Sequence, residues 1–311
     1  MLSRCQNDNG YRKRLRQAWA VFGILLLASG LCDAWRSDAS AATSSRPLLV
    51  GFAPFENQSE VLKKAKPIVA TLAKALNMPV QPFVAADYPG VVEAMRGGKL
   101  DVAFYSPAAL IMAERVAKAR VILKSVYKGL PVYYSSIIVR RDSPIKTLAQ
   151  LRRQSFAFVD PASTTGGIYP KLMLIKAGLD PDHDLGRIIY AGGHDAAILA
   201  VYNKRVVAAA TFVNDAEARD NPWTHILGKN AGAIRSLAIS APIPNGAVAV
   251  SQSLDPVLVS RIKRAFLSLG ETETGRREMA RMYLIERFVE ASPKDYDPVR
   301  EAFTRLGLKV K

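Results

Sequence analysis

From residue 47 onward, short apolar runs alternate with segments of helical periodicity. Runs typical of buried strands occupy residues 48–53, 80–85, 100–105, 121–127 and 132–140. Between the first two runs, apolar side chains recur every three or four positions, at Val61, Ala65, Ile68, Val69, Leu72 and Leu76. This spacing predicts a helix with one buried face, in which Pro67 either introduces a kink or marks the true start.

A second series of strands and helices follows the turn at 142–144. Strands are predicted at 156–159, 187–190 and 206–213, and helices at 168–177 and 194–203. Further strand signals lie at 238–240 and 247–250, on either side of a turn-rich passage at 241–246. Asp255 and Pro256 then start a helix that Gly270 ends, and the last helix is predicted at 298–306. Together these elements predict an α/β protein with largely parallel sheets.

Two such α/β series predict two lobes. We expect the chain to cross between them near 134–141 and again near 240–250, which would form a two-segment hinge with a ligand cleft between the lobes. Residues 43–139 and 241–311 are accordingly assigned to the first lobe and residues 140–240 to the second. The length of 311 residues also exceeds what one minimal domain requires.

The first 42 residues are typical of a signal peptide. A basic cluster at 12–16 precedes an apolar run at 18–31, and small residues at 39–42 supply a cleavage site. We expect the mature chain to begin at Ala42 or Thr43 and to be exported to the periplasm. Beyond the N-terminus, no uninterrupted apolar stretch is long enough to span a membrane.

The cysteines are Cys5 and Cys32, and both lie within the predicted signal peptide. Lipid attachment at Cys32 is a weaker alternative to cleavage, because Leu31 precedes it where a small residue is needed. A mature chain without a thiol has no disulfide, no thiol nucleophile and no cysteine-ligated metal. We expect neither a metal nor a cofactor.

The formal net charge is +16, and removal of residues 1–42 lowers it to +13. This charge favours anionic partners through general electrostatic steering. The lysines and arginines are scattered over the predicted helices instead of forming a stripe with interleaved aromatic residues. The sequence therefore predicts no nucleic-acid partner.

The most informative motif is the segment 160–167, Asp-Pro-Ala-Ser-Thr-Thr-Gly-Gly, which joins a predicted buried strand to a helix. Unpaired amides at a helix N-terminus carry about half a positive charge. With neighbouring hydroxyls they can hold a tetrahedral anion without a cationic side chain. The alternative is that Ser163 or Thr165 is only a helix N-cap, a position that Ser and Thr often occupy.

A second glycine-rich turn at 191–193 leads into His194 and Asp195 at another predicted helix start. The imidazole could donate to an anion, and its pKa, ordinarily about 6.5, would rise beside bound negative charge. Affinity would then fall as the pH rises through that pKa. An exposed capping histidine is an equally good interpretation. Aromatic residues expected near the cleft walls are Phe55, Tyr88, Phe104, Tyr105, Tyr133 and Tyr134.

Catalysis has little support in the sequence. The histidines, His183, His194 and His225, are far apart, and no HExxH, GxSxG or P-loop motif occurs. Ser163 with His194 as its base is conceivable, but a serine in a run of hydroxyls and glycines is better placed to bind than to attack. We therefore expect no enzymatic activity.

Five blocks, in order along the chain, carry a family resemblance: 86–96 (ADYPGVVEAMR), 99–105 (KLDVAFY), 138–145 (IVRRDSPI), 160–166 (DPASTTG) and 191–195 (AGGHD). They resemble the phosphate/phosphite/phosphonate-binding periplasmic proteins of ABC transporters. The resemblance implies a type 2 periplasmic-binding-protein fold whose lobes close on a small oxyanion. It further implies a monomeric transport component, with an ABC permease of the inner membrane as its partner.

In that family the Ser/Thr run and the histidine hold the phosphonate oxygens, and tyrosines from the other lobe complete the pocket. The resemblance assigns the first role to residues 163–165 and 194, and the second to Tyr88 and Tyr133. The predicted ligand-binding set, with two further pocket candidates added, is Ser163, Thr164, Thr165, His194, Tyr88, Tyr133, Tyr105 and Asn214.

The sequence departs from the family pattern where two acidic residues grip the amine of the substrate. Asn214 and Gly246 occupy those places. An ammonium group in a closed cleft would lose a charge-assisted partner worth about 1.5–3 kcal/mol. Aminoalkylphosphonates are therefore not expected as ligands, unless Asp195 or Asp215 faces inward to compensate.

Three functions stay open on the sequence. A transport receptor for phosphonate, phosphite or phosphate fits the resemblance and the predicted export. A sensory receptor that presents the ligand to a membrane kinase would have the same sequence features. An enzyme acting on a phosphoester would need an acid–base or nucleophilic group, for which Ser163 is the candidate.

Overall fold

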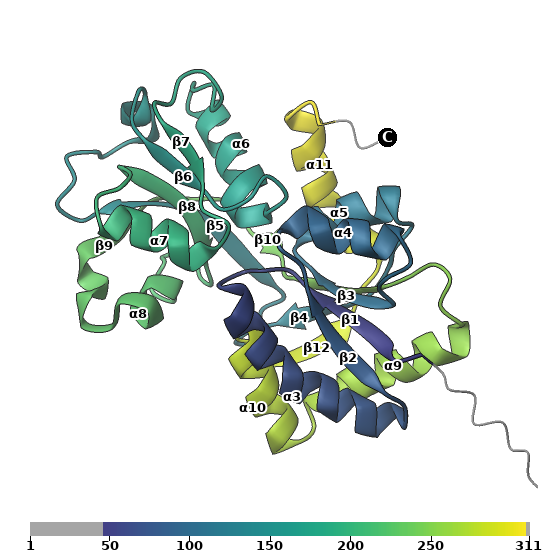
Figure 1. Cartoon of the computed structure of the whole chain (residues 1–311). Helices are drawn as coiled ribbons and strands as arrows, with labels where there is room; N and C mark the ends of the chain where they lie inside the picture. The colour runs from purple at the N-terminus through teal and green to yellow at the C-terminus, as the bar shows by residue number, and fades with distance from the viewer. Residues whose placement is uncertain (1–45, 309–311) are drawn as a thin grey trace, which may run out of the picture. The chain divides into compact units, whose positions relative to one another are not determined.

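The computed structural model describes residues 46–308 and contains two mixed sheets (Figure 1). The first sheet has the strand order β12-β4-β11-β3-β1-β2. Its strands are β1 (Leu48–Phe52), β2 (Val80–Val84), β3 (Val102–Tyr105), β4 (Arg120–Val126), β11 (Ala247–Val250) and β12 (Arg287–Glu290). The second sheet has the order β10-β5-β8-β6-β7, and β9 also pairs with β5. Its strands are β5 (Val132–Arg140), β6 (Phe156–Phe158), β7 (Ile188–Tyr190), β8 (Ala208–Val213), β9 (Ile234–Ile239) and β10 (Ile243–Pro244).

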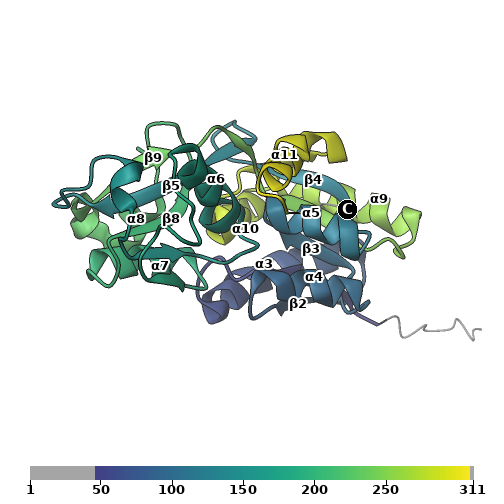
Figure 2. The same ribbon diagram turned by 90° about the horizontal axis from the view of Figure 1, so that it is seen from above.

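Helices accompany both sheets, and the view from above separates the two groups (Figure 2). With the first sheet lie α3 (Gln58–Leu76), α4 (Tyr88–Arg96), α5 (Pro107–Val116), α9 (Pro256–Leu269) and α10 (Glu273–Tyr283). With the second lie α6 (Tyr169–Lys176), α7 (His194–Tyr202) and α8 (Pro222–Leu227). The C-terminal helix α11 (Asp297–Arg305) contacts both α5 and α6. The two predicted α/β lobes are confirmed.

The prediction of largely parallel sheets is wrong. Strands β1, β2 and β3 pair in parallel, as do β6, β7 and β8. The strands next to the crossings, β5 and β11, pair antiparallel with all of their neighbours. Strand β12 also pairs antiparallel, with β4, so β11 and β12 run opposite to the other strands of the first sheet. In the second sheet, β5 runs opposite to all the others.

The crossings themselves follow from the strand pairing. The chain leaves β4 of the first sheet, turns at 127–131 and enters β5 of the second sheet. It returns between β10 and β11, at 245–246, within the segment predicted for the second crossing. The first crossing therefore lies before β5, earlier than the predicted segment 134–141. The lobe boundaries at residues 139 and 240 stay predictions. Because β5 belongs to the second sheet, the first boundary is better placed near residue 131.

Alternation along the central strands divides the core of the first lobe into two layers. On β3, Val102 and Phe104 face one cluster with α3, α9 and α10, whereas Ala103 and Tyr105 face another with α4 and α5. Successive side chains of a strand point to opposite faces, so a strand buried on both faces is apolar throughout. The second cluster continues into the second lobe through residues such as Val159 and Ile198.

Two predicted helices, α3 and α9, each begin directly after an N-cap side chain. Helix α3 buries the six residues of the predicted apolar face and begins at Gln58, where the Asn57 side chain accepts a hydrogen bond from the Ser59 amide at 2.9 Å. Pro67 is therefore not the start of this helix, and it lies on the exposed face. The predicted start of α9 is confirmed, because the Asp255 carboxylate accepts the amides of the first turn.

The predicted signal peptide (1–42), with Cys5 and Cys32, lies outside the described residues. Within 46–308, no helix combines the length and the apolar character that a membrane span requires.

A pair of substitutions on α9 would test the packing of the first lobe. Phe266 is fully buried, with its ring centroid 5.6 Å from Phe104 and 5.4 Å from Phe288. We expect Phe266→Ala to lower the free energy of unfolding by about 3–5 kcal/mol, through lost contacts and the cavity left behind. Val257→Ala, at a side chain 69% exposed on the same helix, should change it by less than about 0.5 kcal/mol. Urea denaturation of both variants would measure the difference, and equal losses would contradict this account of the core.

Candidate functional site

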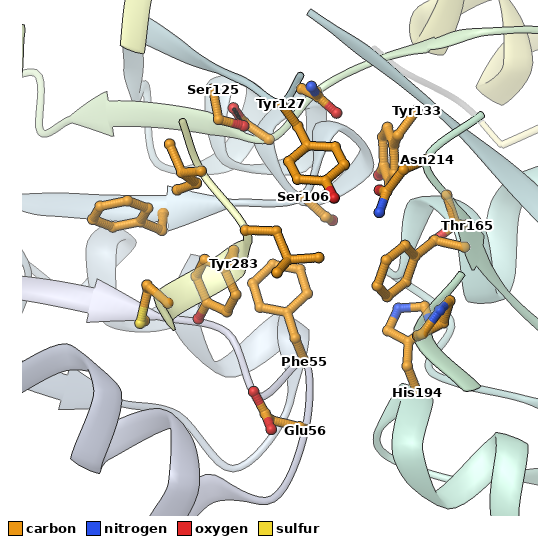
Figure 3. Close-up of a pocket in the computed structure, with 18 of the residues that line it drawn as sticks. Phe55, Glu56, Ser106, Ser125, Tyr127, Tyr133, Thr165, His194, Asn214 and Tyr283 are labelled. Atoms are coloured by element: carbon orange, nitrogen blue, oxygen red, sulfur yellow. Dashed lines mark hydrogen bonds between the residues drawn. The ribbon is translucent and has the colours of Figure 1, made fainter. Parts of the chain in front are cut away.

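A cavity of ≈310 Å³ lies between the two lobes. The segments that form it follow the carboxyl ends of β1 and β3 in the first lobe and of β6 and β8 in the second. Ligands of open α/β sheets commonly bind at this edge. Figure 3 shows Phe55 and Tyr283 on one side of the cavity and Thr165, His194 and Asn214 on the other, with Ser125 and Tyr127 at the top of the view.

The segment 163–168 forms one wall of the cavity and begins with a π-helical turn. The Ser163 hydroxyl accepts a hydrogen bond from the Gly166 amide at 3.1 Å, so Ser163 is the N-cap of this turn. Its own hydroxyl proton is left for another acceptor. The cap of this turn is Ser163 and not Thr165, so the cap interpretation does not apply to Thr165.

The two glycines of this segment are required by close packing. A Cβ atom at Gly166 would lie 2.4 Å from Cβ of Val159, and one at Gly167 would lie 2.3 Å from the carbonyl oxygen of Asp160. Neither neighbour can move without displacing the end of β6. The glycines thus let the turn fold back on its own strand, which brings the hydroxyls of Ser163 and Thr165 to the cleft.

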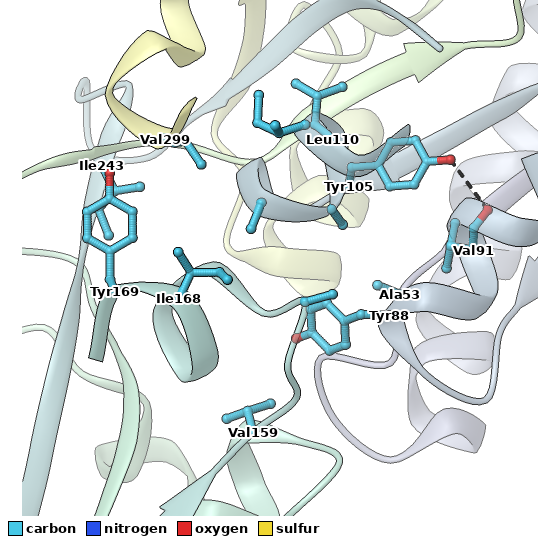
Figure 4. Packing of buried hydrophobic residues seen from close by; sticks show 14 of the residues in the cluster. Ala53, Tyr88, Val91, Tyr105, Leu110, Val159, Ile168, Tyr169, Ile243 and Val299 are labelled. Atoms are coloured by element: carbon cyan, nitrogen blue, oxygen red, sulfur yellow. Dashed lines mark hydrogen bonds between the residues drawn. The ribbon is translucent and has the colours of Figure 1, made fainter. Parts of the chain in front are cut away.

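Tyr88 begins α4 on the other side of the interface, and its hydroxyl is buried without a hydrogen-bond partner among the described residues. Burial raises the pKa of this phenol well above its usual value, and the nearby Ser163 hydroxyl opposes part of the rise. Figure 4 shows the Tyr88 ring directed from α4 toward the second lobe. Tyr88 is not itself part of the cavity lining, whereas Ser163 beside it is. A buried hydroxyl without a partner is costly, so this group is suited to binding a ligand atom that reaches it beside Ser163.

Tyr133, on β5, lines the cavity directly. Burial raises the pKa of its phenol, and hydrogen bonding to the Thr164 and Thr165 side chains opposes part of that increase. The hydroxyls of Ser163, Thr165 and Tyr133 therefore share one part of the cleft, and the Tyr88 hydroxyl lies beside Ser163.

Thr164 does not line the cavity. Its hydroxyl accepts the amide of Ala108, at the start of α5 in the first lobe, at 2.8 Å. Two more hydrogen bonds join the lobes nearby, from the Ser106 hydroxyl to the Ala162 carbonyl at 3.3 Å and from the His194 amide to the Phe55 carbonyl at 3.0 Å. The lobes are thus in direct contact around the cluster of hydroxyls.

His194 starts α7 and is buried against Thr211 and Phe212 of β8. Its Nδ1 lies 3.1 Å from the Thr211 hydroxyl, and its ring meets Phe212 edge to face at a centroid distance of 5.1 Å. Burial lowers its pKa to about 3, so the imidazole is neutral at ordinary pH. The interpretation as an exposed cap is therefore wrong. The expected loss of affinity through imidazolium titration near neutral pH also has no basis in this structure.

The remaining predicted site residues lie in different surroundings. Tyr105 lines the cavity, but its hydroxyl donates to the Val91 carbonyl at 3.4 Å, inside the first lobe (Figure 4). Asn214 also lines the cavity, and its amide donates to Asp220 at 3.0 Å. Asp215 accepts the backbone amides of its own turn and is not part of the lining, whereas Asp195 is.

The cavity combines this polar cluster with an apolar wall that sequence analysis mostly missed. Helix α10 and the strand after it contribute Tyr283, Ile285 and Phe288, and β8 contributes Phe212. No local signal marked these residues, because an apolar side chain that lines a cleft has the same pattern as one in the core. The charged lining residues are Glu56, Lys64, Asp195 and Arg281, and Lys64 is ion-paired with Glu56. Within 46–308, no group of His, Cys, Asp or Glu side chains is arranged to hold a metal ion.

Comparison with known proteins agrees with this geometry. Residues 50–296 match the family described as "ABC transporter, phosphonate, periplasmic substrate-binding protein". The phosphate-import protein PhnD of Mycolicibacterium smegmatis is 30% identical over 80% of this chain and 80% of its own length. The phosphonates-binding periplasmic protein of Escherichia coli is 29% identical, over 79% and 73%. The structure of PhnD1 from Prochlorococcus marinus in complex with methylphosphonate superposes with a TM-score of 0.74 at 20% identity, covering 84% of this chain and 98% of that one. The predicted type 2 fold is confirmed.

The buried His194 makes stability depend on pH. Its pKa is lower in the folded chain than in the unfolded chain, so the unfolded chain binds more protons between about pH 3 and pH 6.5. Stability from this group is complete above that window and is lost as the pH falls. At about pH 4.5 the loss should be about 3 kcal/mol. We expect the His194→Gln variant to lose less stability than the parent protein between neutral pH and about pH 4.5, by that same amount. Urea denaturation at both pH values would measure the difference. If the free energy of unfolding falls equally with pH in variant and parent, the imidazole is not buried in its neutral form.

Proposed function

The chain belongs to the family of periplasmic substrate-binding proteins of phosphonate ABC transporters, and from this premise we propose that its cleft binds a small tetrahedral oxyanion. The candidate anions are a phosphonate, phosphite and phosphate. The observation that carries the proposal is the unpartnered Tyr88 hydroxyl beside Ser163, where a buried donor lacks an acceptor. An anion oxygen would supply that acceptor.

The proposed ligand shell consists of neutral donors. Ser163, Thr165 and Tyr133 present hydroxyls, Tyr88 adds its phenol, and His194 adds an imidazole ring nitrogen. The first amides of the turn at 164–165 extend the set, because a helix start leaves them without intrahelical acceptors. Thr164 would act through the Ala108 amide, by holding the turn against α5. Tyr105 and Asn214 would shape the cavity, since their polar groups are already engaged.

Binding would be coupled to closure of the lobes. The donors come from both sides of the interface, with Tyr88 in the first lobe and Ser163, Thr165 and His194 in the second. A ligand that contacts both sets favours the closed arrangement over any arrangement that separates them. The cross-lobe bonds of Thr164 and His194 would form in the same step.

We propose no catalytic activity for this site. Ser163 is hydrogen-bonded to Gly166 and His194 to Thr211, so neither side chain is positioned to activate the other. The protein would act as a monomer and present its closed form to an ABC permease of the inner membrane. Export through the N-terminal segment is part of this proposal, in agreement with the periplasmic location of the family.

Two substitutions would separate ligand binding from helix capping. Thr165→Val removes a hydroxyl that lines the cavity and does not cap the turn, so we expect methylphosphonate affinity to fall tenfold to a hundredfold, the equivalent of about 1.5–3 kcal/mol, with little change in stability. Ser163→Ala should also lose affinity, and it should lose about 1 kcal/mol of stability because its cap on Gly166 disappears. Calorimetry and urea denaturation would measure the two effects. Full affinity in both variants would contradict the proposed anion site.

A further inference from the structure

The cavity is divided by chemistry into two parts. The hydroxyls of Ser163, Thr165 and Tyr133 form the donor part. The other part has a wall of aromatic and aliphatic side chains from both lobes, chiefly Phe55, Phe104, Phe212, Tyr283, Ile285 and Phe288. Polar lining residues outside the hydroxyl cluster include Ser106, Ser125, Tyr127, Asn245 and Arg281. In Figure 3, Phe55 and Tyr283 face Thr165 and His194 across the cavity. A ligand that satisfies the donors therefore meets an apolar wall on its opposite side.

The size of the cavity exceeds what a bare oxyanion needs. A protein cavity of about 150 Å³ lined by apolar side chains is large enough to hold benzene. The cavity here measures ≈310 Å³, about twice that volume. Phosphate or phosphite bound to the hydroxyls would leave most of this space unfilled. Such apolar space is a poor site for ordered water, which needs two to four polar partners.

The cavity also lacks a carboxylate at Asn214 and Gly246, the positions that the resemblance assigns to acids. Gly246 has no side chain, and the Asn214 amide is hydrogen-bonded to Asp220. The Asp220 carboxylate is occupied in turn by the Tyr127 hydroxyl and the Lys128 ammonium, each at 2.6 Å. The Asp220 carboxylate, to which Asn214 is hydrogen-bonded, is therefore already paired with a hydroxyl donor and a cation.

The other two carboxylates of the lining lie by the loop after β1. Glu56 is ion-paired with Lys64. A Cβ atom at Gly193 would lie 2.5 Å from Asp195 Oδ1 and 3.4 Å from the Glu56 Cα, so Asp195 folds back toward that loop at the start of α7. A helix start stabilises a negative charge there without a ligand cation. Both acids line the cavity, but the ion pair of Glu56 and the helix start at Asp195 already stabilise their charges.

From these features we propose that the ligand is an organic phosphonate whose substituent is uncharged and apolar, of about three to six carbons. The phosphonate oxygens bind the hydroxyl cluster, and the substituent fills the space against Phe55, Phe212 and Tyr283. This assignment rests on the proposed function and narrows it. It ranks alkyl and aryl phosphonates above phosphate, phosphite and aminoalkylphosphonates.

A chain-length series would test the proposal directly. Burial of each methylene group is worth about fourfold in affinity, so n-butylphosphonate should bind about fiftyfold tighter than methylphosphonate. Phenylphosphonate should gain to a similar degree, and phosphate should bind more weakly than any of them. The matched pair is n-propylphosphonate and 2-aminoethylphosphonate, which differ by a terminal methyl against an ammonium. We expect the propyl compound to bind at least tenfold tighter by calorimetry.

Variants at Gly246 would locate the substituent. A Cβ atom there meets only the Tyr105 carbonyl oxygen at 3.4 Å and the Ser125 hydroxyl at 3.8 Å, and both are ordinary contacts. Gly246→Leu should fill the cavity and reduce the butyl-to-methyl affinity ratio to near one. Gly232→Leu, in a loop of the second lobe with open space around it, is the matched control and should keep the parent ratio.

The outcomes separate this proposal from the function on which it rests. If methylphosphonate binds and the longer phosphonates gain nothing, the apolar substituent is refuted while the anion site stands. Tighter binding of 2-aminoethylphosphonate than of n-propylphosphonate would likewise refute an uncharged substituent. If neither phosphate nor any phosphonate binds, the proposed function itself fails. If the Gly246→Leu variant keeps the parent ratio of n-butylphosphonate affinity to methylphosphonate affinity, the substituent binds elsewhere and the assignment is wrong.

Discussion

Desolvation is the constraint on which this site depends. An anion that leaves water for a closed cleft must recover its hydrogen bonds from the protein, and a buried donor with no acceptor costs about 1–3 kcal/mol. Here the Tyr88 hydroxyl is buried without a hydrogen-bond partner among residues 46–308, and His194 is held neutral by its burial. Nothing in this cluster supplies a full positive charge, so the geometry of the donors must perform the recognition.

That constraint explains the local backbone. Bringing hydroxyls and amides to one point requires a turn that folds tightly onto its own strand, which Gly166 and Gly167 permit. The turn is then held from the other lobe, where the Ala108 amide meets Thr164. The Thr164 hydroxyl binds the first lobe, whereas those of Ser163 and Thr165 face the cavity. Consecutive hydroxyls in one motif therefore have different roles.

Sequence analysis identified most of this fold but could not resolve its details. Periodicity was sufficient for the buried face of α3, and the N-cap pattern for the start of α9, because both signals are local. The sheet to which β5 belongs is a matter of long-range pairing, and its apolar pattern would suit either sheet. The site motif was visible as a cluster of hydroxyls and glycines. Its neighbours Thr211 and Phe212 were not, since only the folded chain brings β8 beside His194. The direction of the Tyr105 hydroxyl is likewise decided by tertiary packing.

The C-terminal helix α11 extends these relations beyond the cleft. It packs against α5 of the first lobe and α6 of the second, and the Tyr169 hydroxyl of α6 donates to the Pro298 carbonyl at 3.4 Å. Any change in the angle between the lobes must therefore move α11 against one of them. The sequence contains no cysteine after Cys32. In a chain that starts at residue 46, a single cysteine introduced on α11 would accept an environment-sensitive dye at one defined place, which would turn the protein into an optical reporter of its own ligand without altering the cleft.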